Sequence, residues 1–408
     1  MKILIAAAGS RGDVAPYTGL GARLAAAGHE VALATGEVFA PLVREAGLEF
    51  RPLPADPRGA GPAGTKRELM ATAAAFMRRL ATGMKGAAAD GTELMLLSAT
   101  TAPLGWQLAE ATGVPAMGAY LVPTEPTGAF PPVVGGTRSL GRFGNRALGR
   151  LSLRITDRLF ADAVRDLRAD LGLPQIPPGA VRRRQEAANR PILYGFSEVL
   201  VPRPSDWREG LTVTGNWWPY HDDDFPLPSD VEDFLAAGPP PVLVGFGSMP
   251  ADDAERLSEL AVAALRRAGV RGILQSGRAG LAASGADVLT VGDLPHAVLF
   301  PRLAAVVHHA GAGTAAATLR AGVPSVPVPV MADQPFWAAR LTALGAAPRP
   351  VPFAALTAER LGDAIKCVVT GPVTGPSYAD AARAAARLMA GEDGAGRVVE
   401  AVEGLAWG

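Results

Sequence analysis

The chain has 408 residues, enough for two domains of ordinary size, and its 39 basic residues balance 39 acidic ones, which gives no electrostatic footprint for nucleic acid or an anionic membrane. Cys367 is the only cysteine, so an internal disulfide is excluded, and no apolar run approaches the ~20 residues that cross a bilayer. We therefore expect a cytoplasmic protein with no integral membrane segment, either a monomer or a homodimer.

The first half of the chain alternates between predicted strands and helices. A strand at 2–7 is followed by a turn at 9–12, a helix over about 14–27 and a second strand at 30–35. The alternation continues with helices over 38–46, after Lys66 and over 103–112, and with strands at 48–50, 93–97, 114–119, 192–196 and 211–214. Strands separated by helices predict an α/β domain with a parallel sheet.

Two irregular segments interrupt this alternation. Residues 52–64 and 122–149 are rich in Pro and Gly, and the second also contains Phe130 and Phe143. Long loops in a compact domain are usually functional or disordered. Both are expected to leave from the ligand edge of the sheet, so they are candidates for a binding pocket or for mobile surface loops that touch no substrate.

A domain boundary is expected near residue 215. The stretch from 216 to 240 is dense in Pro and Asp and is too polar and broken for a core element. A second series of strands and helices begins with a strand at 241–246 and ends with helices over 378–389 and 395–405. We expect domains at 1–215 and 241–390, a linker at 216–240 and a final segment at 391–408.

The second domain contains a glycine-rich turn between a predicted strand at 304–308 and a helix over 315–321. Gly311, Gly313 and Thr314 let the backbone approach a ligand closely, and Thr314 can cap the helix while the first helical N–H groups point outward. We expect an anion there, although a turn of this kind alone is weak evidence and also serves as plain structure.

A polar pair follows the next predicted strand, at 323–329. Asp333 and Gln334 lie beyond that strand's carboxyl end, on the edge where ligands bind in open parallel sheets. They can exchange hydrogen bonds with a ligand, or Asp333 can simply cap the helix that begins before Phe336.

Four motifs occur in an order that resembles a known family. They are Gly9-Ser10-Arg11-Gly12-Asp13-Val14 with Pro16, Phe246-Gly247-Ser248-Met249, Leu294-Pro295-His296, and His309-x-Gly311-x-Gly313-Thr314 followed by Gly322-Val323-Pro324 and Asp333-Gln334. The set resembles nucleotide-sugar glycosyltransferases with the GT-B fold. It is most similar to the bacterial branch that includes glycopeptide-antibiotic and sterol glucosyltransferases. This resemblance implies two Rossmann-like domains facing across a cleft, with a C-terminal helix in 391–408 that returns toward the N-terminal domain.

The resemblance implies a role for each motif. The C-terminal domain would bind a UDP- or TDP-sugar, and the N-terminal domain an apolar acceptor. The expected donor contacts are the phosphate-binding Ser248, His309, Gly311, Gly313 and Thr314, the sugar-binding Asp333 and Gln334, and the nucleoside-binding Ser276, Gly277, Arg278 and Leu294. The expected acceptor contacts are Ser10, Tyr120, Phe130 and Phe143.

Transfer to a hydroxyl needs a base on the acceptor wall. Of the five histidines only His29 lies in the first domain, and the turn before the second strand places it on the edge away from ligands. Enzymes with the Gly-Ser-Arg-Gly-Asp opening are thought to use the aspartate, here Asp13, which is also well placed to cap the first helix. Arg11 would orient Asp13, face the diphosphate or remain solvated.

The resulting expectation is an inverting glycosyltransferase that needs no cofactor beyond its donor and no metal. The acidic run Asp222–Asp224 lies in the predicted linker and is typical of a solvated charge run. Two other functions stay open: a sugar-nucleotide 2-epimerase of the same architecture, and a non-catalytic protein that assists a glycosyltransferase.

Overall fold

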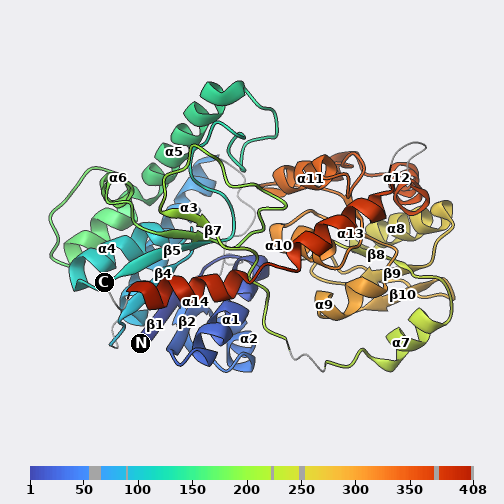
Figure 1. Cartoon of the computed structure of the whole chain (residues 1–408), viewed down its shortest axis with the longest axis horizontal. Coiled ribbons are helices and arrows are strands. Elements are labelled where there is room, and N and C mark those ends of the chain that lie inside the picture. The colour runs from blue at the N-terminus through green and yellow to red at the C-terminus, as the bar shows by residue number, and fades with distance from the viewer. Residues whose placement is uncertain (55–65, 89–90, 222–224, 248–252, 372–375, 406–408) are drawn as a thin grey trace.

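The computed structural model describes residues 1–54, 66–88, 91–221, 225–247, 253–371 and 376–405. In these ranges the chain forms two α/β domains, each built on a parallel sheet, and its last helix returns to the first domain (Figure 1). None of the described helices is long and apolar enough to pass through a lipid bilayer.

The N-terminal domain contains, within the described residues, a seven-stranded parallel sheet in the order β3-β2-β1-β4-β5-β6-β7. The central strands are uninterrupted apolar runs, as expected for strands covered on both faces. β1 pairs with β4 as well as with β2, so the strand order reverses between β1 and β4. The strands are β1 (Lys2–Ala6), β2 (Glu30–Gly36), β3 (Glu49–Leu53), β4 (Leu94–Leu97), β5 (Ala116–Tyr120), β6 (Ile192–Tyr194) and β7 (Leu211–Val213).

Helices cover both faces of this sheet. Apolar residues of α1 and α2 pack with those of the final helix on one face, and residues of α3, α4 and α5 form the core on the other. The helices are α1 (Arg11–Ala26), α2 (Ala40–Glu45), α3 (Lys66–Ala87), α4 (Ala102–Thr112), α5 (Gly141–Asp170) and α6 (Ala180–Ala187), with a 3₁₀ turn at Glu37–Phe39.

The C-terminal domain has, over its described part, a five-stranded parallel sheet in the order β10-β9-β8-β11-β12. This is the order of the first five strands of the other domain, and it reverses between β8 and β11. Ligands of open α/β sheets bind beyond the carboxyl ends of the strands at such reversals. The strands are β8 (Val242–Gly245), β9 (Gly272–Gln275), β10 (Val288–Val291), β11 (Ala305–His308) and β12 (Ser325–Pro327).

The second sheet is also covered on both faces. Apolar residues of α8 and α12 pack on one face, and those of α7 and α9 pack on the other. The helices are α7 (Ser229–Ala236), α8 (Ala254–Ala268), α9 (His296–Leu299), α10 (Ala312–Arg320), α11 (Gln334–Ala343), α12 (Ala358–Thr370), α13 (Tyr378–Met389) and α14 (Gly394–Leu405), with 3₁₀ turns at Phe300–Arg302 and Phe353–Ala355.

The segment between the domains is packed rather than loose. Trp217 is buried in the core beside α1, and Tyr220 N donates to Thr18 Oγ1 at 3.0 Å. The expectation that no core element lies between residues 216 and 240 was wrong, because α7 forms there and buries Val231 and Leu235. The acidic run Asp222–Asp224 lies outside the described residues.

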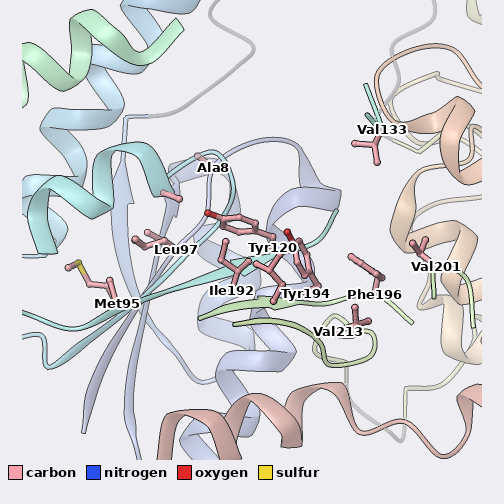
Figure 2. Packing of buried hydrophobic residues seen from close by; sticks show 14 of the residues in the cluster. Ala8, Met95, Leu97, Tyr120, Val133, Ile192, Tyr194, Phe196, Val201 and Val213 are labelled. Carbon is pink, nitrogen blue, oxygen red and sulfur yellow. The ribbon is translucent and has the colours of Figure 1, made fainter. Parts of the chain in front are cut away.

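The domains touch through an apolar contact that continues the core of the first domain. Phe196, which follows β6, packs on Trp337 of α11 with ring centroids 6.2 Å apart. Tyr194 packs against both Tyr120 and Phe196 in the same cluster (Figure 2). On the other side of the contact α1 meets α10, so the helices that begin at the two predicted ligand turns are neighbours.

Candidate active site

Asp13 lies in the first turn of α1, directly beyond β1. Ser10 donates to Asp13 Oδ2 twice, from its backbone N at 2.7 Å and from its hydroxyl at 2.8 Å. Gly9 has a φ of +149°, and a Cβ at this position would come within 2.7 Å of the Asp13 side chain. The glycine of the motif therefore makes room for the carboxylate, and one carboxylate oxygen helps to cap α1.

The pKa of Asp13 is raised above its ordinary value. The side chain is open to the gap between the domains, but the protein atoms around it displace bulk water, and this desolvation disfavours the charged form. The two hydrogen bonds from Ser10 partly oppose the rise. A carboxylate with a raised pKa is a stronger base, which suits proton abstraction.

Arg11 reaches the other domain. Its Nη1 lies 3.3 Å from Oδ2 of Asp293, in the loop after β10, and both side chains are more than half exposed. In this structure Arg11 therefore spans the gap between the domains, and it forms an ion pair with Asp293 of the other domain. A pair this exposed contributes little to stability.

The glycine-rich turn follows β11 as expected, but its helix begins earlier than predicted. Gly311 occupies the N-cap position of α10 and makes no side-chain cap, so the expectation that Thr314 caps this helix was wrong: Thr314 lies inside the first turn. The N–H groups of the first turn have no partner within a helix. A Cβ at Gly313 would meet nothing within 4 Å, so the glycine opens onto free space.

His309 fills the space between the two central loops of the second domain. A Cβ at Gly247 would lie 2.9 Å from the His309 ring, and one at Gly311 would lie 2.6 Å from it. Burial lowers the pKa of His309 to about 4, so the ring is neutral near pH 7, and among the described residues its buried Nδ1 has no hydrogen-bond partner. Ser248, predicted to join this group, lies outside the described residues.

His308 points into the protein, as the alternation of side chains along a strand requires. It is buried, and its Nδ1 accepts a hydrogen bond from Ala310 N at 3.1 Å. Burial lowers the pKa of His308 to about 3. His308 is therefore a packed residue, and His309 is the one that faces the turn.

Asp333 and Gln334 lie at the start of α11. Asp333 Oδ2 accepts a hydrogen bond from Trp337 Nε1 at 2.7 Å, and it does not cap the helix with its side chain. The oxygen of the Gln334 amide accepts from the backbone N of Val330 and of Met331, at 2.8 and 3.1 Å. Both side chains are thus oriented by the turn that carries them.

The charge of Asp13, in the N-terminal domain, acts on Asp333 in the C-terminal domain. Desolvation is the main cause of the raised pKa of Asp333, and the negative charge of Asp13 raises it further, while the hydrogen bond from Trp337 opposes the rise. Two acids from different domains therefore face one space. The adjoining turns hold Ala310 and Ala332 at φ values of +61° and +55°, a strained geometry that is common at functional sites.

The segments predicted to contact a nucleoside lie beyond β9 and β10. Ser276 donates from its N and its hydroxyl to Val291 O, at 3.0 and 3.2 Å, and Arg278 N donates to Gly247 O at 3.0 Å. Gly277 adopts a φ of +47° between them. Leu294 is half-buried at the next loop. These residues share the ligand edge of the sheet with the glycine-rich turn.

The N-terminal domain contains a cavity of about 740 Å³ beside its ligand edge. Tyr120 and Phe130 line it, together with Ala99 and Thr100 in the loop after β4, next to β1. Phe143 was wrongly predicted to line the acceptor site, because it is absent from the cavity lining and its ring is 90% exposed. Ser10 is absent from the lining and contacts Asp13 instead.

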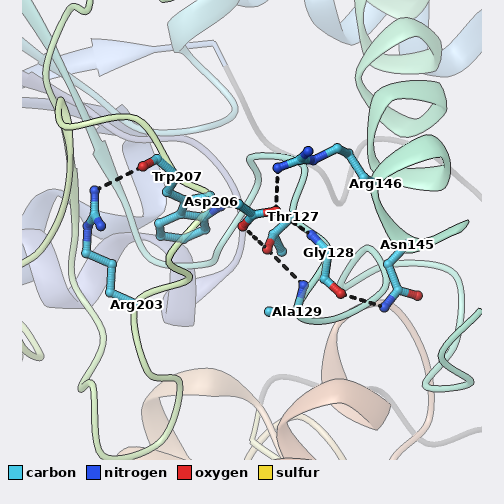
Figure 3. Close-up of polar contacts among 8 residues, drawn as sticks. All are labelled: Thr127, Gly128, Ala129, Asn145, Arg146, Arg203, Asp206 and Trp207. Atoms are coloured by element: carbon cyan, nitrogen blue, oxygen red, sulfur yellow. Dashed lines mark hydrogen bonds and ion pairs between the residues drawn. The ribbon is translucent and has the colours of Figure 1, made fainter. Parts of the chain in front are cut away.

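Asp206 holds the cavity loop in place. It accepts hydrogen bonds from Thr127 Oγ1 at 2.6 Å, Gly128 N at 2.8 Å and Arg146 Nη2 at 2.6 Å, and only 8% of its side chain is exposed (Figure 3). Burial raises the pKa of Asp206, but these donors outweigh that effect and lower the pKa. Neither Asp206 nor α5 and α6, which wall the cavity, was found from the sequence.

The cavity loop also contacts the second domain. The ring of Phe130 packs on Phe336 of α11, with centroids 5.3 Å apart, and the guanidinium of Arg340 lies 5.2 Å from the centroid of Phe130. Because Phe336 lies three residues after Asp333, this contact joins the cavity loop of the N-terminal domain to the turn that carries Asp333.

Two family models match the sequence. The one described as "Glycosyltransferase family 28 N-terminal domain" matches residues 3–90, and the one described as "Erythromycin biosynthesis protein CIII-like, C-terminal domain" matches residues 269–405. Among curated relatives, O-mycaminosyltylonolide 6-deoxyallosyltransferase of Streptomyces fradiae is 39% identical, over 91% of this chain and 90% of its own. A sterol 3-beta-glucosyltransferase of Arabidopsis thaliana is 33% identical, over 98% of this chain but 65% of its own.

Solved structures share the fold. The glycosyltransferase of kitacinnamycin superimposes with a TM-score of 0.73 at 21% identity, covering 98% of both chains. A glycosyltransferase of Streptomyces sp. SF2575, complexed with thymidine diphosphate, gives a TM-score of 0.63 at 23% identity, covering 99% of both. The two facing parallel-sheet domains form the GT-B architecture.

Proposed function

The chain belongs to the GT-B glycosyltransferase family that includes macrolide and sterol glycosyltransferases, and from this membership we propose that it moves a hexose or deoxyhexose from a UDP- or TDP-sugar to a hydroxyl group of an apolar natural product. The observation that carries the proposal is the pair of carboxylates, Asp13 and Asp333, that face one space from opposite domains. A transfer reaction needs a base beside the acceptor and a sugar contact beside the donor, and two carboxylates on opposite sides of one space can serve these two roles.

In this proposal Asp13 is the catalytic base. Its free oxygen takes the proton of the acceptor hydroxyl while that hydroxyl attacks the anomeric carbon of the donor. A single displacement from an α-linked sugar nucleotide inverts the anomeric centre and gives a β-glycoside. Ser10 keeps the carboxylate in position, and the raised pKa of Asp13 suits a base.

The leaving diphosphate would be held at the start of α10. Backbone N–H groups around Gly311 to Thr314 and the neutral His309 ring are donors for its negative charge, and the helix terminus favours an anion. Prearranged donors of this kind are often the largest contribution to catalysis. They support a transfer that needs no metal ion.

The proposed donor and acceptor classes follow the relatives. Support for a TDP-sugar comes from the neighbouring structure solved with thymidine diphosphate, and support for a bulky apolar acceptor comes from relatives named for tylonolide and sterol transfer. A cavity of about 740 Å³ lined by Trp106, Tyr120, Phe130 and Phe160 is large enough for such a molecule.

The test is a transfer assay with UDP- and TDP-sugars and a panel of polycyclic and macrocyclic alcohols, with and without EDTA. We expect release of the nucleotide diphosphate and a β-glycoside for at least one pair, unaffected by EDTA. A strict metal requirement, or an α-glycoside, would contradict the mechanism. Conversion of the donor sugar without an acceptor would instead indicate a sugar-nucleotide 2-epimerase, and stimulation of another glycosyltransferase without activity of its own would indicate an auxiliary protein.

A further inference from the structure

Glu125 is a carboxylic acid in the wall of an otherwise largely apolar cavity. It belongs to the loop that follows β5, and its side chain lines the same space as Trp106, Tyr120, Phe130 and Phe160. Burial raises the pKa of Glu125 to about 7. A carboxyl group in such surroundings is costly unless a partner compensates for the lost water.

The described residues supply no such partner. None of them forms a hydrogen bond or an ion pair within 4.0 Å with the Glu125 carboxyl. The other buried acids near the cavity are satisfied: Asp206 accepts three hydrogen bonds, and Asp157 forms an ion pair with Arg182 at 2.7 Å. Glu125 thus differs from these two acids, because its carboxyl group has no hydrogen-bond or ion-pair partner among the described residues.

The charged groups that act on Glu125 have other partners, although among the described residues the buried Nε of Arg208 makes no hydrogen bond. Arg182 of α6 binds Asp157 and also Glu186, and Arg208 donates to Asn189 Oδ1 at 3.0 Å. Glu186 repels a charge on Glu125, whereas Arg182 and Arg208 attract it from farther away. Two further arginines, Arg165 and Arg190, line the cavity at exposed positions.

Two phenols close to Glu125 are neutral. The phenols of Tyr120 and Tyr194 have pKa values raised by burial and, secondarily, by the charge of Glu125, so they stay protonated near pH 7. Tyr120 lines the cavity together with Glu125, and an aromatic ring beside an unpaired carboxylate suits a positively charged nitrogen through a cation–π contact and an ion pair.

We propose that Glu125 binds a protonated amine on the acceptor, so that the preferred acceptor is an apolar hydroxyl compound with one basic nitrogen. This inference rests on the proposed function, since it assigns the cavity to the acceptor. The hydroxyl would lie toward Asp13, past Ala99 and Thr100, and the ammonium group would lie at Glu125. Its binding would give the half-buried carboxylate the charged partner that it lacks.

The test compares two acceptor analogues that differ only in a dimethylamino or an isopropyl group on the same polycyclic or macrocyclic alcohol. Their affinities are measured by calorimetry without donor, so the result does not depend on turnover. We expect the wild-type protein to bind the amine at least about tenfold more tightly near pH 7.5. Equal affinities would overturn the inference.

The variant Glu125→Gln keeps the size and polarity of the side chain but removes its charge. It should lose the preference for the amine and bind the isopropyl compound within about threefold of wild type. Glu209→Gln, at an exposed position outside the cavity lining, is the matched control and should keep the preference. A preference that survives Glu125→Gln would assign the amine to another residue.

The pH dependence separates an ionised Glu125 from a protonated one. If the carboxylate binds an ammonium group, the amine preference grows as pH rises from 6 to 8 through the pKa of about 7. A neutral acid that donates a hydrogen bond to the acceptor would give affinity that falls over the same range, and this result would contradict the proposal.

The same ligands distinguish this failure from failure of the proposed function. If both compounds bind equally and the isopropyl alcohol is glycosylated, the transfer function stands and only the amine preference is lost. If neither binds and neither yields a glycoside with any donor, both proposals fail for this acceptor class.

Discussion

Asp13 combines two tasks in one carboxylate. One oxygen accepts both hydrogen bonds from Ser10 at the start of α1, and the other is available to a substrate. The sequence led to Asp13 as base or as cap, and the geometry allows both at once, because the carboxylate has two oxygens. Kinetic measurements on a variant therefore decide whether Asp13 acts as a base in addition to capping the helix.

The variant Asp13→Asn tests the catalytic task. Its amide oxygen still accepts a hydrogen bond from Ser10, but the side chain no longer takes a proton, so we expect kcat to fall by about 10²- to 10⁴-fold. Affinity for the donor and the melting temperature should stay close to those of the wild type. Retention of most of the activity would reduce Asp13 to a helix cap.

Asp206 offers a prediction on stability. Asp206→Asn should lower the free energy of unfolding by about 2 kcal/mol near neutral pH, since a buried charged acceptor is lost. The folded-state pKa of Asp206 is depressed, so its contribution is present above the unfolded-state pKa of about 3.9 and disappears as pH falls through the folded-state value.

Denaturant titrations of both proteins at several pH values measure this difference, which should shrink in acid. Asp170→Asn, at the exposed end of α5, is the control and should change stability by less than about 0.5 kcal/mol. A loss that is independent of pH would mean that the charge of Asp206 is not what matters.

At the scale of elements, diphosphate binding at the start of α10 can be tested separately from the stability of that helix. Gly313→Asp places a negative charge in the first helical turn, where it stabilises a helix by about 0.3–1 kcal/mol, and no neighbour obstructs its Cβ. If the diphosphate binds there, the same charge repels it, and we expect donor affinity to fall at least about tenfold.

Titration with UDP and TDP measures the change in affinity, and a thermal melt measures the change in stability. Gly313→Asn is the uncharged control and should retain more of the affinity than the aspartate variant. Equal affinities in the two variants would place the diphosphate away from this helix.

The elements that the sequence predicted best are those with a single strong local signal. The turn of α10 follows a valine-rich buried strand, and the helix at Tyr378–Met389 has the predicted bounds. α5 was missed because Gly141, Gly144 and Gly149 fall in its first turns, where local preference disfavours a helix. The packing of its inner face against the cavity loop and α3 determines it instead.

The position of a candidate site residue was predictable where it belongs to a motif at a strand end. It was not predictable where side chains from distant segments meet. Asp13 and Asp333 reach one gap because the parallel strands of their sheets end there, and His309 follows β11 at the same edge of the second sheet. Glu125, Arg182 and Asp206 come together only through the long α5 and the loop before β7, and no spacing in the sequence marks that meeting.

At the scale of the whole molecule, Phe130 couples the two domains. Phe130→Ala should lower the free energy of unfolding by about 2–3 kcal/mol, less than a fully enclosed phenylalanine because one side of its ring faces the cavity. Losing the contact with Phe336 should also raise the KM for the acceptor about tenfold. Chemical denaturation and initial-rate kinetics measure the two effects.

Phe143→Ala is the matched control, because it removes the same ring from an exposed site. It should change stability by less than about 0.5 kcal/mol and leave the KM unaltered. Similar changes in the two variants would show that the exposed ring contributes to the acceptor site after all.

The return of α14 to the N-terminal domain has a consequence for biosynthesis. Val398 and Val402 complete the apolar layer between α14 and α1, and Gly394 lies so close to the backbone of Gly215 and Asn216 that a Cβ would come within about 2.6 Å of it (Figure 1). The N-terminal domain leaves the ribosome first, so its apolar surface beside α1 stays exposed until α14 has been translated. Nascent chains that end before this helix should therefore be the ones that bind chaperones.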